Sequence, residues 1–116
     1  MATILVVDDE EPIRQLVTRV LEKKGHTVIS FGTAKEALAV TTPIDLLLVD
    51  FILPELNGRD LTEALRKRRA DLPVILMSGY LPQRNLLPDQ PSIFLQKPML
   101  PSAVVQAVDN LLGIKN

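Results

Sequence analysis

Residues 44–50, with the sequence IDLLLVD, decide the fold, because a run of large apolar side chains ends there on Asp50. A short and almost continuous apolar run is typical of a strand buried on both faces, as in a parallel sheet covered by helices. The run ILVV at residues 4–7 repeats the pattern and ends on Asp8 and Asp9. Both runs therefore predict central strands of one parallel sheet.

Runs of this kind alternate along the chain with longer segments in which apolar residues recur at helical spacing. The alternation predicts an α/β fold with right-handed crossovers: a doubly wound, five-stranded parallel sheet of order 2-1-3-4-5, the flavodoxin-like arrangement. We expect strands at residues 3–7, 27–31, 44–49, 73–77 and 93–96. We expect helices at residues 12–25, 33–40, 58–69 and 101–112, with a capping box from Thr33 to Glu36 and no side-chain cap at Leu100.

The segment 80–91 breaks this regularity with Pro82, Pro88 and Pro91. Proline in a helix interior costs about 3 kcal/mol, so at most a short helix fits between them. The fourth helix of the fold is therefore expected to be short or broken. The length of 116 residues suits one domain, and we expect residues 1–116 to form a single unit.

The composition argues against several classes of function. Lysine and arginine total 13 against 14 acidic residues, a net charge near −1, so we expect no direct nucleic-acid binding. The basic run at residues 66–69 is interpreted as a solvated helix end that complements the helix dipole. Cysteine is absent, which excludes disulfides and thiolate metal sites.

Membrane insertion is not expected, because the apolar runs are far shorter than the ~20 residues of a membrane-spanning helix. The amino terminus leads directly into a strand and leaves no room for a signal peptide, which favours a cytoplasmic location. The one histidine, His26, lies between a helix and a strand, and we interpret it as an exposed turn residue.

Carboxylates and a cation are expected to meet at one edge of the sheet. The carboxyl ends of parallel strands border the ligand crevice, so Asp8, Asp9 and Asp50 should converge there with Lys97, which follows the last strand. Neighbouring carboxylates repel one another unless a cation is present, and Mg²⁺ typically binds one or two carboxylates together with phosphate oxygens. Lys97 and the Ser78 hydroxyl would hold phosphoryl oxygens, while one carboxylate attacks phosphorus.

The chain resembles a response-regulator receiver domain of two-component phosphorelays over essentially its full length. Four motifs in order carry the resemblance: VVDDE at residues 6–10, Asp50 with Pro54 and Gly58, Ser78-Gly79, and Lys97-Pro98. The resemblance implies that Asp50 accepts a phosphoryl group from a histidine kinase or a phosphotransfer domain, in a reaction that needs Mg²⁺.

The resemblance also implies the metal ligands. Asp9 would bind Mg²⁺ directly together with Asp50, Asp8 would act mainly through water, and the backbone carbonyl of Ile52 would complete the site.

A conformational switch follows from the same resemblance. Ser78 would move toward the phosphoryl group and Phe94 would turn inward behind it. The peptide bond before Pro98 would be cis and would aim Lys97 inward, an isomer that proline makes accessible.

A closer resemblance is to receivers attached to hybrid sensor histidine kinases, on residues 77–80 and 94–98. It leaves open whether the chain stands alone or belongs to a larger kinase. Typical receivers dimerise through their fourth helix, fifth strand and fifth helix, and the proline-broken segment 80–91 argues against that dimer here.

Alternative functions make different demands on the sequence. An unphosphorylated scaffold of the same fold would be expected to lack Asp50 or Lys97. A hydrolase with an aspartyl-phosphate intermediate usually has two aspartates with one residue between them, whereas Asp8 and Asp9 are adjacent. A flavin-binding protein would need a phosphate-binding loop where residues 8–11 are all acidic. The favoured hypothesis is a signalling module that acts as an enzyme only toward itself.

Overall fold

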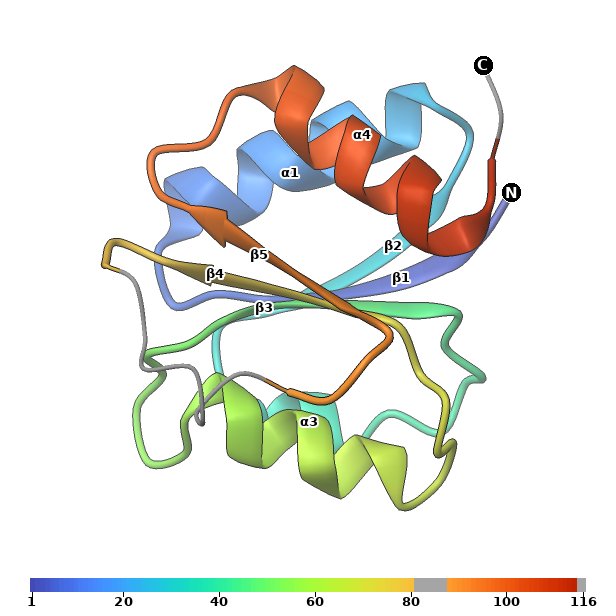
Figure 1. Cartoon of the computed structure of the whole chain (residues 1–116). Coiled ribbons are helices and arrows are strands. Elements are labelled where there is room, and N and C mark those ends of the chain that lie inside the picture. The colour runs from blue at the N-terminus through green and yellow to red at the C-terminus, as the bar shows by residue number, and fades with distance from the viewer. Residues whose placement is uncertain (81–87, 115–116) are drawn as a thin grey trace.

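Five parallel strands form the centre of the computed structural model, which describes residues 1–80 and 88–114 (Figure 1). Their order is β2-β1-β3-β4-β5, so the predicted topology is confirmed. The strands are β1 (Thr3–Val7), β2 (Thr27–Phe31), β3 (Leu46–Asp50), β4 (Val74–Ser78) and β5 (Ser92–Gln96). The helices in the described part are α1 (Glu11–Lys23), α2 (Ala34–Leu38), α3 (Gly58–Arg66) and α4 (Pro101–Leu112).

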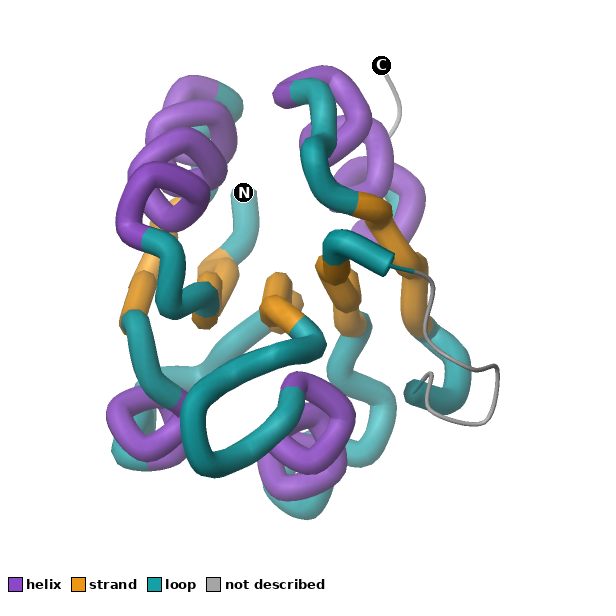
Figure 2. The backbone as a smooth tube through the Cα atoms, turned by 90° about the vertical axis from the view of Figure 1, so that its left-hand side faces the viewer, coloured by secondary structure: helices purple, strands orange, loops and turns teal. Residues whose placement is uncertain are grey.

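The helices cover both faces of the sheet, with α1 and α4 on one side and α2 and α3 on the other (Figures 1 and 2). Successive side chains of a strand point to opposite faces, so β1 places Leu5 and Val7 against α2 and α3 but Ile4 and Val6 under α1 and α4. Both faces are therefore buried, and each fully buried aliphatic side chain contributes about 1.5–3 kcal/mol. This is why the central strands show continuous apolar runs.

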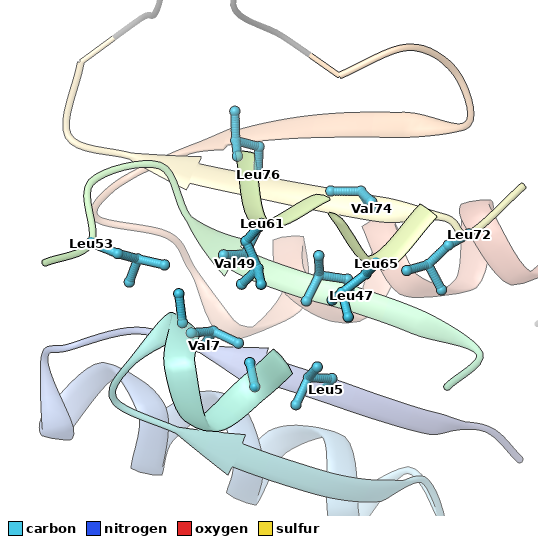
Figure 3. Close-up of a cluster of buried hydrophobic side chains, with 12 residues drawn as sticks. Leu5, Val7, Leu47, Val49, Leu53, Leu61, Leu65, Leu72, Val74 and Leu76 are labelled. Atoms are coloured by element: carbon cyan, nitrogen blue, oxygen red, sulfur yellow. The ribbon is translucent and has the colours of Figure 1, made fainter. Parts of the chain in front are cut away.

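The core between the sheet and α2 and α3 is drawn in Figure 3. Aliphatic residues from β1, β3, β4 and α3 build it; Figure 3 labels Leu5, Val7, Leu47, Val49, Leu53, Leu61, Leu65, Leu72, Val74 and Leu76. Phe94 of β5 packs against the same cluster while remaining partly exposed.

Two predicted helix starts are confirmed. The Thr33 hydroxyl oxygen accepts the backbone N–H of Glu36 at 3.2 Å and donates to the Glu36 carboxylate at 2.9 Å, which caps α2. Leu100 precedes α4 and makes no side-chain cap, and the helix begins on Pro101. Proline suits a first helical position because its missing N–H would lack a helical partner there.

Several element boundaries differ from the predictions by one to three residues. Strand β3 begins two residues later than predicted, and the Asp45 carboxylate accepts the Thr3 N–H at 2.8 Å at that end of the sheet. Strand β4 begins after Pro73, which has no N–H to donate to the ladder. Helix α3 ends at Arg66 because its last turn tightens, as the Arg68 N–H donates to the carbonyl of Leu65 at 3.0 Å.

The prediction that His26 is an exposed turn residue is wrong. The side chain is only 7% exposed, and its Nδ1 accepts the backbone N–H of Ala2 at 3.1 Å. Gly25, with φ 90°, turns the chain back after α1 and brings His26 against the start of β1. The sequence contains a turn here, but the contact that buries the imidazole spans 24 residues.

The basic run 66–69 is more than a solvated helix end. Arg66 donates to the carbonyls of Leu72, Asp89 and Pro91 at 2.8–3.1 Å. Arg68 donates to the carbonyls of Leu38 and Val40, and Arg69 to that of Ile44, at 2.6–2.8 Å. These arginines tie the end of α3 to neighbouring loops.

The expectation of at most a short helix between residues 82 and 91 falls largely outside the described residues. Residues 88–91, where the description resumes, carry no helix. Within the described ranges, no helix is long and apolar enough to cross a membrane.

Candidate functional site

The carboxyl ends of β1, β3 and β5 meet around one ammonium group, at the edge of the sheet that faces the viewer in Figure 2. The Lys97 Nζ lies 2.8 Å from Asp8 Oδ2 and 2.9 Å from Asp50 Oδ2. It also lies 2.9 Å from Glu10 Oε1. Residues up to 89 positions apart in the sequence thus form one ion-paired cluster, as expected from the parallel topology.

The two buried aspartates are oriented by the same local turn. Asp8 Oδ1 accepts the backbone N–H of Glu10 at 2.8 Å, and Asp50 Oδ1 accepts that of Ile52 at 3.1 Å. Aspartate side chains commonly bond the backbone two residues on in such turns. Each carboxylate therefore has one oxygen fixed by the backbone and the other directed to Lys97.

A glycine allows α3 to begin against the end of β3. The Gly58 N–H donates to the carbonyl of Phe51 at 2.8 Å. A Cβ atom on Gly58 would lie 2.5 Å from the carbonyl oxygen of Asp50 and 3.0 Å from Leu76. Gly58 is therefore required by close packing behind Asp50, which explains its place in the sequence motif.

Burial and ion pairing oppose each other at the site. Burial of the Asp8 carboxyl raises its pKa above the ordinary value, and the contacts with Lys97 and the Glu10 N–H only partly offset this. For Lys97, burial alone would lower the pKa, but the contacts with Asp8, Glu10 and Asp50 outweigh it and raise the pKa above its usual range. Lys97 therefore carries its charge throughout the physiological pH range.

The residues present fit a hard divalent cation. Asp8, Asp9, Glu10 and Asp50 each offer a carboxylate oxygen within 4.8 Å of the others. The fully buried Asp8 Oδ2 has only the ion pair with Lys97 and makes no well-oriented hydrogen bond, so it retains coordinating capacity. An all-oxygen donor set with excess negative charge suits Mg²⁺.

A cavity of about 550 Å³ opens above this cluster and is lined by Asp9, Asp50, Ile52, Tyr80 and Lys97, among others. A cavity of about 580 Å³ lies at the opposite end of the strands, between Leu5, Leu72 and the 40–45 segment. Its arginines, Arg68 and Arg69, already donate to carbonyls. The acid cluster makes the first cavity the functional candidate.

Ser78 and Phe94 belong to β4 and β5 and are not members of the ion-paired cluster around Lys97. Ser78 ends β4 and is buried; its hydroxyl oxygen accepts the Tyr80 N–H at 3.3 Å, and its carbonyl accepts the Lys97 N–H at 2.7 Å. Phe94 lies in β5 opposite Leu76 of β4. The peptide bond between Lys97 and Pro98 is cis, as is that between Gln90 and Pro91.

Two residues of the site were given no role of their own from the sequence. Glu10 contacts Lys97, and its sequence signal is its place at the end of the VVDDE motif at residues 6–10. Arg14 of α1 donates to the Asp8 carbonyl at 2.7 Å and lies against Gly32, which fixes the backbone of the acidic loop. Nothing in the local sequence distinguishes this arginine from a solvated helix residue.

Known proteins share both sequence and fold with this chain. Sensor kinase CckA of Brucella abortus is 33% identical over 96% of this chain, which spans 12% of that protein. Response regulator SaeR of Staphylococcus aureus is 28% identical over 97% of this chain, which spans 51% of that protein. The chain therefore covers about half or less of these relatives.

Solved structures agree with this result. The receiver domain from hybrid histidine kinase CckA superposes with a TM-score of 0.83 at 30% identity, covering 95% of this chain and 98% of that chain. A CheY-like response regulator receiver domain protein from Methanospirillum hungatei gives 0.87 at 28% identity, with 97% and 94% covered. The response regulator receiver domain family matches residues 4–109. The chain belongs to the family of response regulator receiver domains.

Proposed function

We propose that Asp50 accepts a phosphoryl group from a histidine kinase or phosphotransfer domain, in a Mg²⁺-dependent reaction that switches the conformation of the domain. Membership of the family supports the broader role in phosphorylation-controlled signalling. The contact of Lys97 Nζ with both Asp8 and Asp50 carries the finer proposal, because it gathers a nucleophile, a metal-binding acid and a phosphate-binding cation at one point.

Each residue has a distinct part in the proposed transfer. Asp50 is the nucleophile, and Lys97 binds a phosphoryl oxygen as a point cation. Asp8, Asp9, Asp50 and the Ile52 carbonyl would hold Mg²⁺. When bound, the metal would neutralise charge on the phosphoryl oxygens.

The transfer balances as a displacement at phosphorus. A carboxylate oxygen of Asp50 attacks the phosphorus of the phosphohistidine, a P–O bond forms, and the P–N bond breaks with its electron pair returning to the imidazole. In the later hydrolysis, water attacks the same phosphorus and the P–O bond to Asp50 breaks. Its electron pair stays on the carboxylate, and inorganic phosphate and a proton leave. The domain thus acts as an enzyme only on itself.

The proposed switch links the new charge to β4 and β5. A phosphorylated side chain carries about −1.5 to −2 charge at neutral pH, and its oxygens are strong acceptors. Ser78 would turn its hydroxyl from the Tyr80 N–H toward a phosphoryl oxygen, and Phe94 would fill the vacated space. The phosphorylated form would thereby bias an equilibrium between two conformations.

The test is intact-mass analysis after incubation with acetyl phosphate and Mg²⁺. We expect one added phosphoryl group on the parent chain and none on Asp50→Asn. Asp60→Asn makes the same chemical change at an exposed residue of α3 and should be phosphorylated like the parent. A parent that stays unmodified, or an Asp50→Asn variant that is modified equally, would overturn the proposal.

A further inference from the structure

We propose that Glu10 is a positioning residue that holds Lys97 in the resting state and thereby slows phosphorylation of Asp50. The inference rests on the proposed function and adds to it a residue that sets the rate. The observation that supports it is the distance of 2.9 Å between Glu10 Oε1 and Lys97 Nζ.

Carboxylates surround the ammonium group of Lys97 in the resting state, and two of them, Glu10 and Asp50, accept hydrogen bonds from it at 2.9 Å. A lysine ammonium has three N–H donors. Three carboxylates lie 2.8–2.9 Å from the Lys97 Nζ, those of Asp8, Glu10 and Asp50. A phosphoryl oxygen on Asp50 therefore competes with these carboxylates for the ammonium group, and it binds Lys97 more readily when one of the contacts is given up.

Glu10 is the contact that is given up most easily. The side chain of Asp8 is 0% exposed and is fixed by the Glu10 N–H, and Asp50 is the phosphoacceptor itself. The side chain of Glu10 is 58% exposed and makes no cap on α1. Its carboxylate can swing into water, where solvation replaces the ion pair.

Release of Glu10 becomes part of the barrier to phosphorylation. Exposed ion pairs are weak, so removal of this one should speed phosphorylation by about two- to fivefold. The charge of Glu10 also repels an incoming anionic phosphodonor at the mouth of the cavity that Glu10 helps to line. Two variants separate the contact from this general repulsion.

Glu11 provides the matched control. It is the next residue, it is also exposed, and its carboxylate accepts Gln15 Nε2 at 3.0 Å instead of contacting Lys97. Glu11→Gln therefore removes the same charge without freeing Lys97. Glu10→Asp keeps the charge but draws the carboxylate back by one methylene group, away from Lys97.

The experiment measures the rate of phosphorylation by acetyl phosphate at saturating Mg²⁺, followed by intact mass. We expect Glu10→Gln and Glu10→Asp to be about two- to fivefold faster than the parent, and Glu11→Gln to be unchanged. Mg²⁺ affinity, determined by calorimetry for each variant, sets the saturating concentration. Equal acceleration by Glu11→Gln, or a rate in Glu10→Gln that is unchanged or slower, would overturn the role of the contact.

A spectroscopic readout tests the contact without any reaction. In the metal-free protein with ¹⁵N-labelled lysine, the Lys97 Nζ resonance should shift in Glu10→Gln and Glu10→Asp but not in Glu11→Gln. An unshifted resonance contradicts the inference alone. A parent chain that acetyl phosphate does not modify contradicts the proposed function, and with it the inference, so the two failures are distinguishable.

Discussion

The two ends of the parallel strands use charge in opposite ways. At the carboxyl ends, one cation, Lys97, is shared by three carboxylates. At the amino ends, Arg66, Arg68 and Arg69 donate mainly to backbone carbonyls. The first arrangement keeps an excess of negative charge that a metal ion can neutralise, whereas the second satisfies its acceptors within the protein. Incomplete neutralisation, more than the number of charges, distinguishes the functional end from the structural one.

The largest expected effect is the loss of the shared cation. Lys97→Met should lower the free energy of unfolding by about 3 kcal/mol without Mg²⁺, because it leaves the buried Asp8 and Asp50 unpaired. Urea denaturation measures the change. Lys35→Met, at an exposed position of α2, should have little effect.

Added Mg²⁺ sharpens the same prediction. The metal should restore part of the stability of Lys97→Met, because it supplies the missing positive charge to the same carboxylates. Equal stability of Lys97→Met and the parent in the absence of metal would contradict the view that Lys97 holds this end of the sheet together.

The second effect concerns packing behind Asp50. Gly58→Ala should cost about 2–3 kcal/mol, because its Cβ would lie 2.5 Å from the Asp50 carbonyl oxygen and the start of α3 must shift. Gly79→Ala is the control, since a Cβ there meets nothing within 4 Å. Thermal denaturation followed by circular dichroism compares them, and equal melting temperatures would show that α3 can move away freely.

The fold and the central acids could be predicted because they depend on local patterns. Buried strands need continuous apolar runs, and the parallel topology then places Asp8, Asp50 and Lys97 at one edge. The roles of Glu10 and Arg14 depend on which side chain reaches across a gap in three dimensions, and no spacing rule specifies that.

The same limit explains what was misjudged at the amino ends. The sequence around His26 correctly indicates a turn. The burial of the His26 side chain, however, depends on Ala2, which the fold places next to the imidazole. The basic run at 66–69 has the composition of a solvated helix end. Its arginines are fixed by carbonyls 6 to 30 residues away, and such partners are invisible in a local pattern.

The third effect tests the structural end of the sheet. Arg66→Ala should cost about 2 kcal/mol, because the carbonyls of Leu72 and Pro91 lose a charged donor. Arg66→Lys keeps the charge without the planar fork and should recover only part of the loss. Urea denaturation of these variants beside Lys67→Ala, an exposed neighbour, measures the contribution. Full recovery of the free energy of unfolding in Arg66→Lys would show that the positive charge alone, without the planar fork, accounts for the contribution of Arg66.

The smallest effect is a pH dependence at the amino ends. Burial lowers the pKa of His26 below its usual value, the nearby N-terminal ammonium lowers it further, and Asp109 acts in the opposite direction. The unfolded chain therefore binds a proton more readily than the folded chain does. The contribution of uncharged His26 to the free energy of unfolding is fully present above the unfolded pKa of about 6.5. It is lost as the pH falls from there toward the lowered pKa of the folded chain.

Asparagine at position 26 isolates this effect from the carboxylates that titrate at lower pH. The His26 Nδ1 accepts the Ala2 N–H, and an asparagine carbonyl can accept it at every pH, whereas a protonated imidazole cannot. We expect the free energy of unfolding of the parent, relative to His26→Asn, to fall between pH 7.5 and pH 5.5. Parallel urea titrations measure it. A constant difference across this range would mean that the imidazole has the same pKa in the folded and the unfolded chain, and that the amino ends of the strands contain no titrating contact at His26.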